Sequence, residues 1–154
     1  MSNAIELRLS ELGLTLPAAP APAANYVPFV RSGALVFVSG QISAAPDGLI
    51  CGRLGDTMAV EEGVAAARHC ALALVAQLRE ACGGDLTLLR RVIKLTGFVN
   101  CTPDFTDQPK VINGASDLMV AVFGEAGRHA RVAVGAPSLP LGVAVEIDGI
   151  FEIG

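Results

Sequence analysis

Hydrophobic residues recur with helical spacing in three segments of the chain. The longest pattern alternates steps of four and three and comprises Val60, Val64, Ala67, Ala71, Leu74 and Leu78. That spacing places the side chains along one face of an α-helix. We expect this helix to begin at an Asp56-Thr57 cap and to end at Gly83-Gly84. Similar patterns predict a second long helix over residues 109–123 and a short one over 5–12, stopped by Gly13.

Other hydrophobic segments have the composition of β-strands. They are rich in β-branched and aromatic residues and predict strands over residues 26–31, 34–40, 91–100, 130–135 and 142–153. Ser32-Gly33 separates the first two segments and is typical of a hairpin turn, and Asp47-Gly48 marks a further turn. The proline-containing stretch 137–140 joins the last two strands.

The predicted element order is ββαβαββ, preceded by the short N-terminal helix. Two amphipathic helices among these strands predict an α+β domain, with the helices on one face of a mostly antiparallel sheet. Residues 17–24 are rich in proline and alanine, so we expect them to form an extended linker over the surface. We therefore divide the chain into an N-terminal helix and linker, residues 1–24, and one domain, residues 25–154.

Candidate chemistry lies on the last two strands, where side chains alternate between the two faces of the sheet. Arg131 stands among small residues, on the opposite side from Val132 and Val134. In the final strand the same alternation places Ala144, Glu146, Asp148 and Glu152 away from the helices. Arg131 and Glu146 then form either a solvated ion pair, or a ligand site for a carboxylate that a second subunit covers.

Composition favours the covered site. The chain has 154 residues, of which 52% are hydrophobic and 17% charged, so one small domain has more apolar surface than it can easily hide. We expect an oligomer. The net charge of −4 argues against nucleic-acid binding, which depends on clustered Lys and Arg. The N-terminus lacks the pattern of a secretory signal, and prolines interrupt the longest uncharged stretch, so we expect a soluble cytoplasmic protein without a membrane span.

Other common sites are not evident in the sequence. The four cysteines are widely separated and only two histidines accompany them, so we expect reduced, buried thiols and no metal centre. Phosphate-binding glycine motifs and the hydrolase motifs of serine and zinc enzymes are also missing. His129 lies two residues before Arg131 and either helps to hold an anion or belongs to a turn at the strand edge.

Several of these residues carry a resemblance to the reactive-intermediate deaminase family, also called the Rid or YjgF family. The matching segments span about residues 25–153. They are Tyr26 followed thirteen residues later by Ser39-Gly40-Gln41, the helix that ends in Phe123, Arg131-x-x-Val134-x-x-x-x-Leu139-Pro140, and Val145-Glu146-Ile147. The N-terminal helix, the proline-rich linker and the segment FGEAGRHAR resemble a longer subgroup of that family.

This resemblance implies a chorismate-mutase-like α+β fold that assembles as a homotrimer, with a ligand site in each cleft between subunits. It further implies an enzyme without a cofactor that hydrolyses reactive enamines and imines to 2-keto acids and ammonia. Position by position, Arg131 would clamp the substrate carboxylate and Glu146 would position or activate water. Tyr26 and Ser39 would line the pocket, and Gly40 would provide backbone contacts.

The sequence departs from the family pattern at two places. A family cysteine two residues after the arginine is Ala133 here, which keeps the backbone carbonyl and removes the thiol. The family's helix asparagine falls on Ser116, while Asn113 lies one turn earlier. Two other functions therefore stay open beside the deaminase: a trimer that binds a small carboxylate without turnover, and a ribonuclease.

Overall fold

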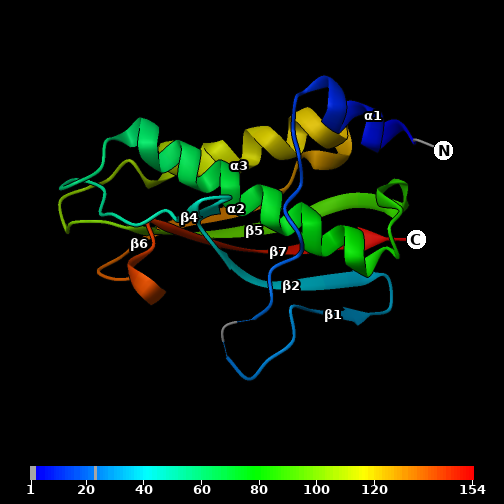
Figure 1. Ribbon diagram of the computed structural model, residues 1–154, viewed down its shortest axis with the longest axis horizontal. Coiled ribbons are helices and arrows are strands. Elements are labelled where there is room, and N and C mark those ends of the chain that lie inside the picture. Colours follow the sequence, from blue (N-terminus) through cyan, green and yellow to red (C-terminus); the bar gives the residue numbers. More distant parts are fainter. Residues whose placement is uncertain (1–2, 23) are drawn as a thin grey trace.

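Five strands form one mixed sheet in the computed structural model, which describes residues 3–22 and 24–154. Their order across the sheet is β1-β2-β7-β5-β6, and only β5 and β6 run parallel (Figure 1). The strands are β1 (Phe29–Ser32), β2 (Leu35–Ile42), β5 (Leu89–Asn100), β6 (Ala130–Ala136) and β7 (Val145–Ile153). The mostly antiparallel sheet predicted from the sequence is thus confirmed.

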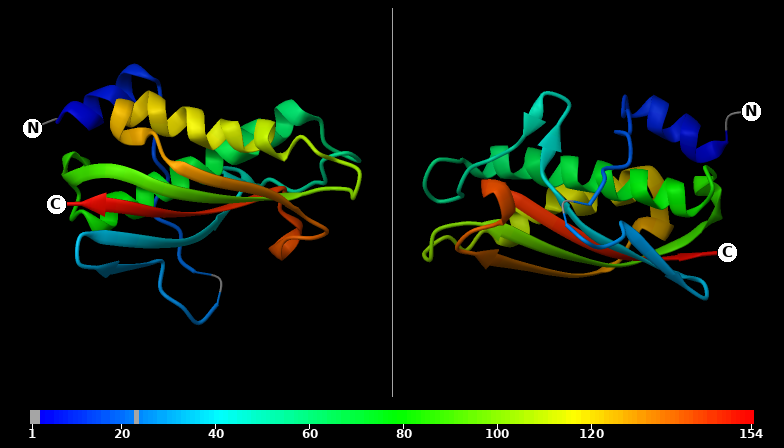
Figure 2. Two further views of the ribbon diagram at one scale, coloured as in Figure 1. Left: turned by 180° about the vertical axis from the view of Figure 1, so that it is seen from behind. Right: turned by 60° about the horizontal axis from the view of Figure 1, so that its bottom comes forward.

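Two long helices cover one face of this sheet, as predicted. Figure 2 shows α2 (Val60–Ala81) and α3 (Gln108–Phe123) on the same side of the sheet, with α1 (Ala4–Glu11) outside them. Helix α2 packs over β2 and β7, and α3 packs over β5 and β6. None of the three α-helices among the described residues lies on the opposite face of the sheet. This arrangement confirms the α+β fold class with an added N-terminal helix.

The boundaries of several elements differ from the prediction, and β1 begins at Phe29 and not at Tyr26. Helix α2 begins at Val60 and not at an Asp56-Thr57 cap. The Thr57 hydroxyl accepts from the backbone N–H of Arg53 in the preceding turn, and the Glu62 carboxylate accepts from the N–H of Ala59, 2.9 Å away. The side chain that accepts the backbone N–H at the start of α2 therefore belongs to a residue of the helix itself.

The last strand begins later than expected, because Pro140–Gly142 forms the short 3-10 helix η3 and β7 starts only at Val145. The Asp47-Gly48 turn forms a small additional hairpin between β3 (Ala44–Ala45) and β4 (Gly48–Leu49). Two further 3-10 helices, η1 (Leu86–Leu88) and η2 (Gly124–Gly127), follow α2 and α3.

The core lies between the sheet and the two long helices. Alternate residues of β7, including Val145, Ile147 and Phe151, are buried against the helices. Of the four residues predicted to point away from the helices, Ala144 is not accessible. It precedes β7 and is fully buried, with backbone hydrogen bonds to both Ile50 and Asn100. Glu146, Asp148 and Glu152 keep the predicted direction on the open face.

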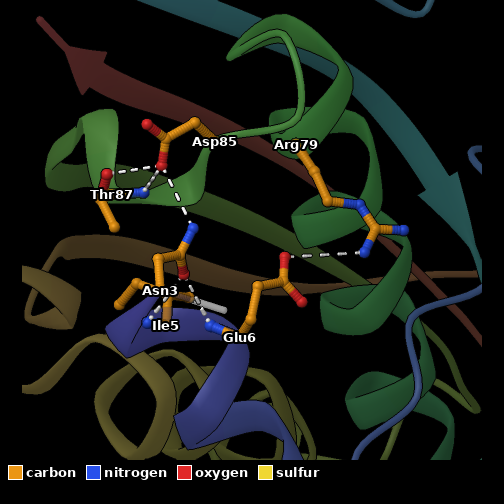
Figure 3. Close-up of polar contacts among 6 residues, drawn as sticks. All are labelled: Asn3, Ile5, Glu6, Arg79, Asp85 and Thr87. Carbon is orange, nitrogen blue, oxygen red and sulfur yellow. Dashed lines mark hydrogen bonds and ion pairs between the residues drawn. The ribbon is translucent and has the colours of Figure 1, made fainter. Parts of the chain in front are cut away.

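The N-terminal helix is attached to the helical layer by side-chain contacts at its start (Figure 3). The side-chain oxygen Oδ1 of Asn3 caps the helix by accepting from the backbone N–H groups of Ile5 and Glu6, while the side-chain NH₂ group of Asn3 donates to Asp85. Glu6 pairs with Arg79 of α2 at 3.9 Å. Leu9 of this helix is buried in the main core.

The linker that follows is held against α2. Gln77 is almost fully buried, and its amide donates to the carbonyl of Pro20 at 2.6 Å. One residue of the predicted linker, Ala23, lies outside the described residues. The rest crosses α2 toward β2 without regular secondary structure, as the prolines predict (Figure 1).

All four cysteines are free thiols, but only three of them are buried: Cys70, Cys82 and Cys101. Cys51 is exposed beside η3, which corrects the expectation that all four are buried. Among residues 3–22 and 24–154, no helix is long and apolar enough to cross a membrane. Nor do His, Cys, Asp and Glu side chains in this part of the chain cluster as a metal site requires.

The two long helices touch where Gly114 of α3 meets the carbonyl of Val64 in α2. A methyl group at this position would overlap the backbone of α2. We expect Gly114→Ala to lower the free energy of unfolding by about 1–3 kcal/mol, although alanine favours helix more than glycine does. Urea denaturation would measure the loss. Asp117→Ala on the exposed side of α3 is the control, with an expected change below about 0.5 kcal/mol.

Candidate functional site

Arg131 is anchored at the β6 edge of the sheet, on the face that α3 covers. Its register partner Leu95 is a core residue, which fixes the side of the sheet to which Arg131 belongs. The guanidinium donates to Asn113 Oδ1 at 2.8 Å, to Ser116 Oγ at 3.2 Å and to the carbonyl of Pro109 at 3.3 Å. All three acceptors are uncharged groups of α3, so they orient the guanidinium and leave its charge uncompensated.

His129 supports this arrangement from the start of β6. Its Nδ1 lies 2.6 Å from the carbonyl of Gly127, which can only accept, so Nδ1 carries the proton. Nε2 is then the acceptor for the Ser116 hydroxyl, 2.8 Å away. Burial, and with it the positive charge of Arg131, lowers the pKa of His129. A neutral histidine thus fixes the hydroxyl whose oxygen accepts from Arg131.

Glu146 lies on the opposite, helix-free face of the sheet. Its strand β7 is central, and Gly40 of β2 packs directly against the carboxylate, where any Cβ would overlap it. Burial raises the pKa of Glu146, and the neighbouring charge of Asp148 adds to this effect. A carboxylate that resists ionisation is better suited to exchanging protons near neutral pH than an ordinary surface glutamate.

Tyr26 and Ser39 lie beside Glu146. The ladder between β2 and β7 is irregular between Val38 and Gln41, and β1 pairs only with residues 35–38 of β2. The Ser39 N–H and hydroxyl bond to the carbonyls of Pro28 and Val27, which brings the segment after Tyr26 against this edge. Tyr26, Ser39, Gly40 and Glu146 line one cavity of about 700 Å³.

The predicted site residues therefore fall into two groups within one chain. Tyr26, Ser39, Gly40 and Glu146 share the cavity at β2, while Arg131, Ala133, Asn113 and Ser116 lie at the β6 end, which does not line it. Ala133 follows Arg131 on the same face and packs against the core. The hypothesis of an Arg131–Glu146 ion pair within the chain was wrong, because the side chains point to opposite faces of the sheet.

The face that carries Glu146 is otherwise strongly apolar. Phe37, Val132 and Val134 are each about two-fifths exposed there, and Val30 at the edge is 53% exposed. Glu146 and Asp148 interrupt this surface, and burial raises the pKa of Asp148 as well. An exposed apolar sheet face of this kind is typical of a surface that packs against another protein.

Several residues around the cavity were not predicted from the sequence. His69 reaches it from α2, Gln41 from β2, and the linker forms one wall from Thr15 to Pro22. Leu141 lies at the same cavity, is 67% exposed, and has φ = 59°, a conformation that leucine rarely adopts. No motif marks His69 or Leu141. For the linker, the proline content predicted only an extended segment on the surface.

Leu141 illustrates strain beside a candidate site. Because glycine tolerates a positive φ and the leucine side chain is mostly exposed, we expect Leu141→Gly to stabilise the fold by about 0.5–1 kcal/mol. Thermal unfolding would measure this. Leu139→Gly is the matched control: φ is −127° at Leu139 and the side chain is half-buried, so this change should destabilise. Equal losses in both variants would contradict strain at Leu141.

Glu146 should make stability depend on pH. A raised pKa in the folded state means that the neutral carboxyl favours folding below about pH 4.5, and that this contribution is lost as the pH rises through the folded-state pKa. We expect Glu146→Gln to unfold at a higher temperature than the natural protein at pH 7. At pH 3.5 the two should unfold together. A lower unfolding temperature for the variant at pH 7 would show that the carboxylate is stabilising.

Comparisons with known proteins identify the family to which the chain belongs. A family model described as "YjgF/chorismate mutase-like, putative endoribonuclease" matches residues 6–150. Protein TCP17 of Trypanosoma cruzi is 51% identical over 154 residues, which cover 99% of this chain and 96% of that protein. The crystal structure of Atu1372 from Agrobacterium tumefaciens, a protein of unknown function, is 51% identical with a TM-score of 0.91, covering 97% of this chain and 92% of that one.

A more distant solved structure contains a ligand. TdcF of E. coli with bound serine is 26% identical, with a TM-score of 0.63, and the match covers 89% of this chain and 94% of that chain. The resemblance noted in the sequence is confirmed by these matches. The chain belongs to the YjgF/chorismate mutase-like, or Rid, family.

Proposed function

We propose that the protein hydrolyses reactive 2-imino acids to 2-keto acids and ammonia, at a cleft between two subunits of a homotrimer. The observation that carries this proposal is the separation of Arg131 from Glu146. Each is prepared for a ligand, yet they lie on opposite faces of one sheet, Glu146 on the central strand β7 and Arg131 on the edge strand β6. A second copy of the chain is the simplest way to bring a guanidinium and a carboxylate of this kind together.

The separation also favours a ring. A contact between the β6 end of one protomer and the β2 cavity of the next uses two different surfaces, and such contacts close into rings when the rotation permits. The apolar face around Phe37, Val132 and Val134 would be buried in the same assembly. Three copies are the number that the family resemblance implies.

Arg131 suits a substrate carboxylate. None of the ion pairs among the described residues includes it, and its three acceptors are neutral. An arginine held by neutral acceptors keeps its charge for an anion that it can grip with two donors. The serine bound to the relative TdcF is a small molecule of this class.

Glu146 would move the protons. It takes one proton from a water molecule as that water adds to the carbon of the protonated imine, which gives a neutral carbinolamine. The same proton then passes to the nitrogen. As the carbon–nitrogen bond breaks, the carbinolamine hydroxyl gives its proton to the carboxylate, ammonia leaves behind a 2-keto acid, and the carboxyl returns this last proton to the ammonia, which departs as ammonium. The overall reaction consumes one water and needs no cofactor or redox partner. The raised pKa of Glu146 lies closer to neutrality, where proton transfer in both directions is efficient.

A mixing experiment tests both the reaction and the shared site. We expect Arg131→Ala and Glu146→Gln to abolish the accelerated loss of 2-iminobutyrate, followed by semicarbazide trapping. If each site takes Arg131 from one subunit and Glu146 from another, co-refolding equal amounts of the two inactive variants restores about a quarter of the sites. The control is each variant refolded alone.

Three outcomes separate this proposal from its alternatives. An unchanged imine lifetime with the natural protein would contradict the deaminase. Carboxylate-dependent thermal stabilisation without imine loss, abolished by Arg131→Ala, would instead identify a binding protein. RNA cleavage that survives both variants would support the ribonuclease, against which the net charge of −4 argues. The expected cytoplasmic location and the lack of nucleic-acid partners belong to the same proposal.

A further inference from the structure

The cavity at Glu146 continues well beyond the candidate reaction centre. Tyr26, Ser39, Gly40 and Glu146 occupy the part formed by the β-strands and by the segment that precedes β1. The remaining walls come from the linker, α2 and the β3-β4 hairpin, and they are mostly apolar, with Leu16, Pro20, Ala45, Leu49, Leu72 and Ala73 among them. Thr15 and His69 are the polar exceptions in these walls.

This apolar part of the cavity, which we call the linker chamber, has a fixed outer wall. The buried Gln77 holds the carbonyl of Pro20 at 2.6 Å. Upstream, α1 is held by Glu6 with Arg79 and by Asn3 with Asp85 (Figure 3), and by Arg8, which donates to the carbonyl of Ala121 at 2.8 Å. Prolines at 17, 20 and 22 further limit the linker's conformations. The chamber is therefore preformed in the single chain.

Its size exceeds the needs of the smallest 2-imino acids. Cavities of about 300–1,000 Å³ hold ligands of drug size, and this one measures about 700 Å³. A four-carbon acid that reaches Glu146 would leave most of the apolar wall uncovered. Each further methylene buried against that wall strengthens binding by up to about 0.8 kcal/mol, or roughly fourfold.

We propose that the linker chamber receives the side chain of the substrate, and that the protein selects 2-imino acids and 2-oxo acids with long apolar side chains. This inference rests on the proposed function for the class of substrate, and adds to it the part of the molecule that discriminates among substrates. The carboxylate end of the ligand faces Arg131 of the neighbouring subunit, the reacting carbon lies at Glu146, and the side chain points toward Leu72 and Ala73.

Binding of stable 2-oxo acids tests the chamber without requiring turnover. By titration calorimetry at pH 7, we expect the full-length protein to bind 2-oxooctanoate at least tenfold more tightly than 2-oxobutanoate. Ala73→Leu fills the chamber from α2 and Ala45→Leu fills it from the hairpin, so each should bring this ratio close to one by weakening 2-oxooctanoate. Ala65→Leu is the matched control, because Ala65 is exposed on α2 and does not line the cavity.

Equal affinity for the two acids in the natural protein would overturn the inference, as would binding of neither. So would a ratio that both filling variants leave unchanged, since the side chain would then lie elsewhere. Ala73 is buried, so a leucine there could prevent folding. In that case the comparison rests on Ala45→Leu alone. The two proposals can fail separately. Tighter binding of the long acid without accelerated imine loss would support the chamber and contradict the deaminase. Accelerated imine loss with equal kcat/KM for short and long imines would support the deaminase and contradict the chamber.

Discussion

The carboxylate of Glu146 on an apolar sheet face is the constraint on which the site depends. A charged group in such a place loses hydration that nothing on the open face restores, and its raised pKa records that loss. Gly40 lets the carboxylate lie against the backbone of β2, and a side chain there would displace the flexible end of Glu146. The irregular ladder of β2, and the start of β1 only at Phe29 opposite Val38, then leave the cavity open beside it. The raised pKa of Glu146 is thus a consequence of its burial, and the open cavity beside it is a consequence of how β1 and β2 pair.

At the β6 end of the sheet, a positive charge is held without an ion-pair partner. Arg131 is oriented by an amide, a hydroxyl and a backbone carbonyl, and none of these neutralises it. An internal carboxylate would hold the arginine more strongly, but it would also compete with an anionic ligand. The two ends therefore share a principle. Neither Arg131 nor Glu146 belongs to an ion pair among the described residues, and in the proposed function a ligand would supply the partner of the arginine.

Local patterns were enough to predict the α+β class and the order of the elements along the chain. The helical stripes of α2 and α3, the hairpin at Ser32-Gly33 and the strand segments all depend on contacts that periodicity records. The predicted boundaries were wrong where a side chain or a short segment formed local hydrogen bonds that periodicity does not record. Thr57 bonds within its own turn and leaves the start of α2 to Glu62, and Pro140–Gly142 forms a 3-10 helix that delays β7. Alternation along one strand also could not relate Arg131 to Glu146, because their relative faces depend on the register of β5 with both neighbours.

The Ser116–His129 pair shows how a departure from the family pattern can preserve its role. An amide at position 116 could bond to an arginine directly, whereas a serine hydroxyl is shorter and rotates freely. His129 removes that freedom: Gly127 fixes the proton on Nδ1, so Nε2 accepts from the hydroxyl and leaves its oxygen facing Arg131. The lowered pKa of His129 keeps the ring in the neutral form that this chain of bonds requires. A histidine two residues before the arginine is therefore part of the arginine's positioning and does not serve as a second anion ligand, because its proton-bearing nitrogen is already committed to the backbone.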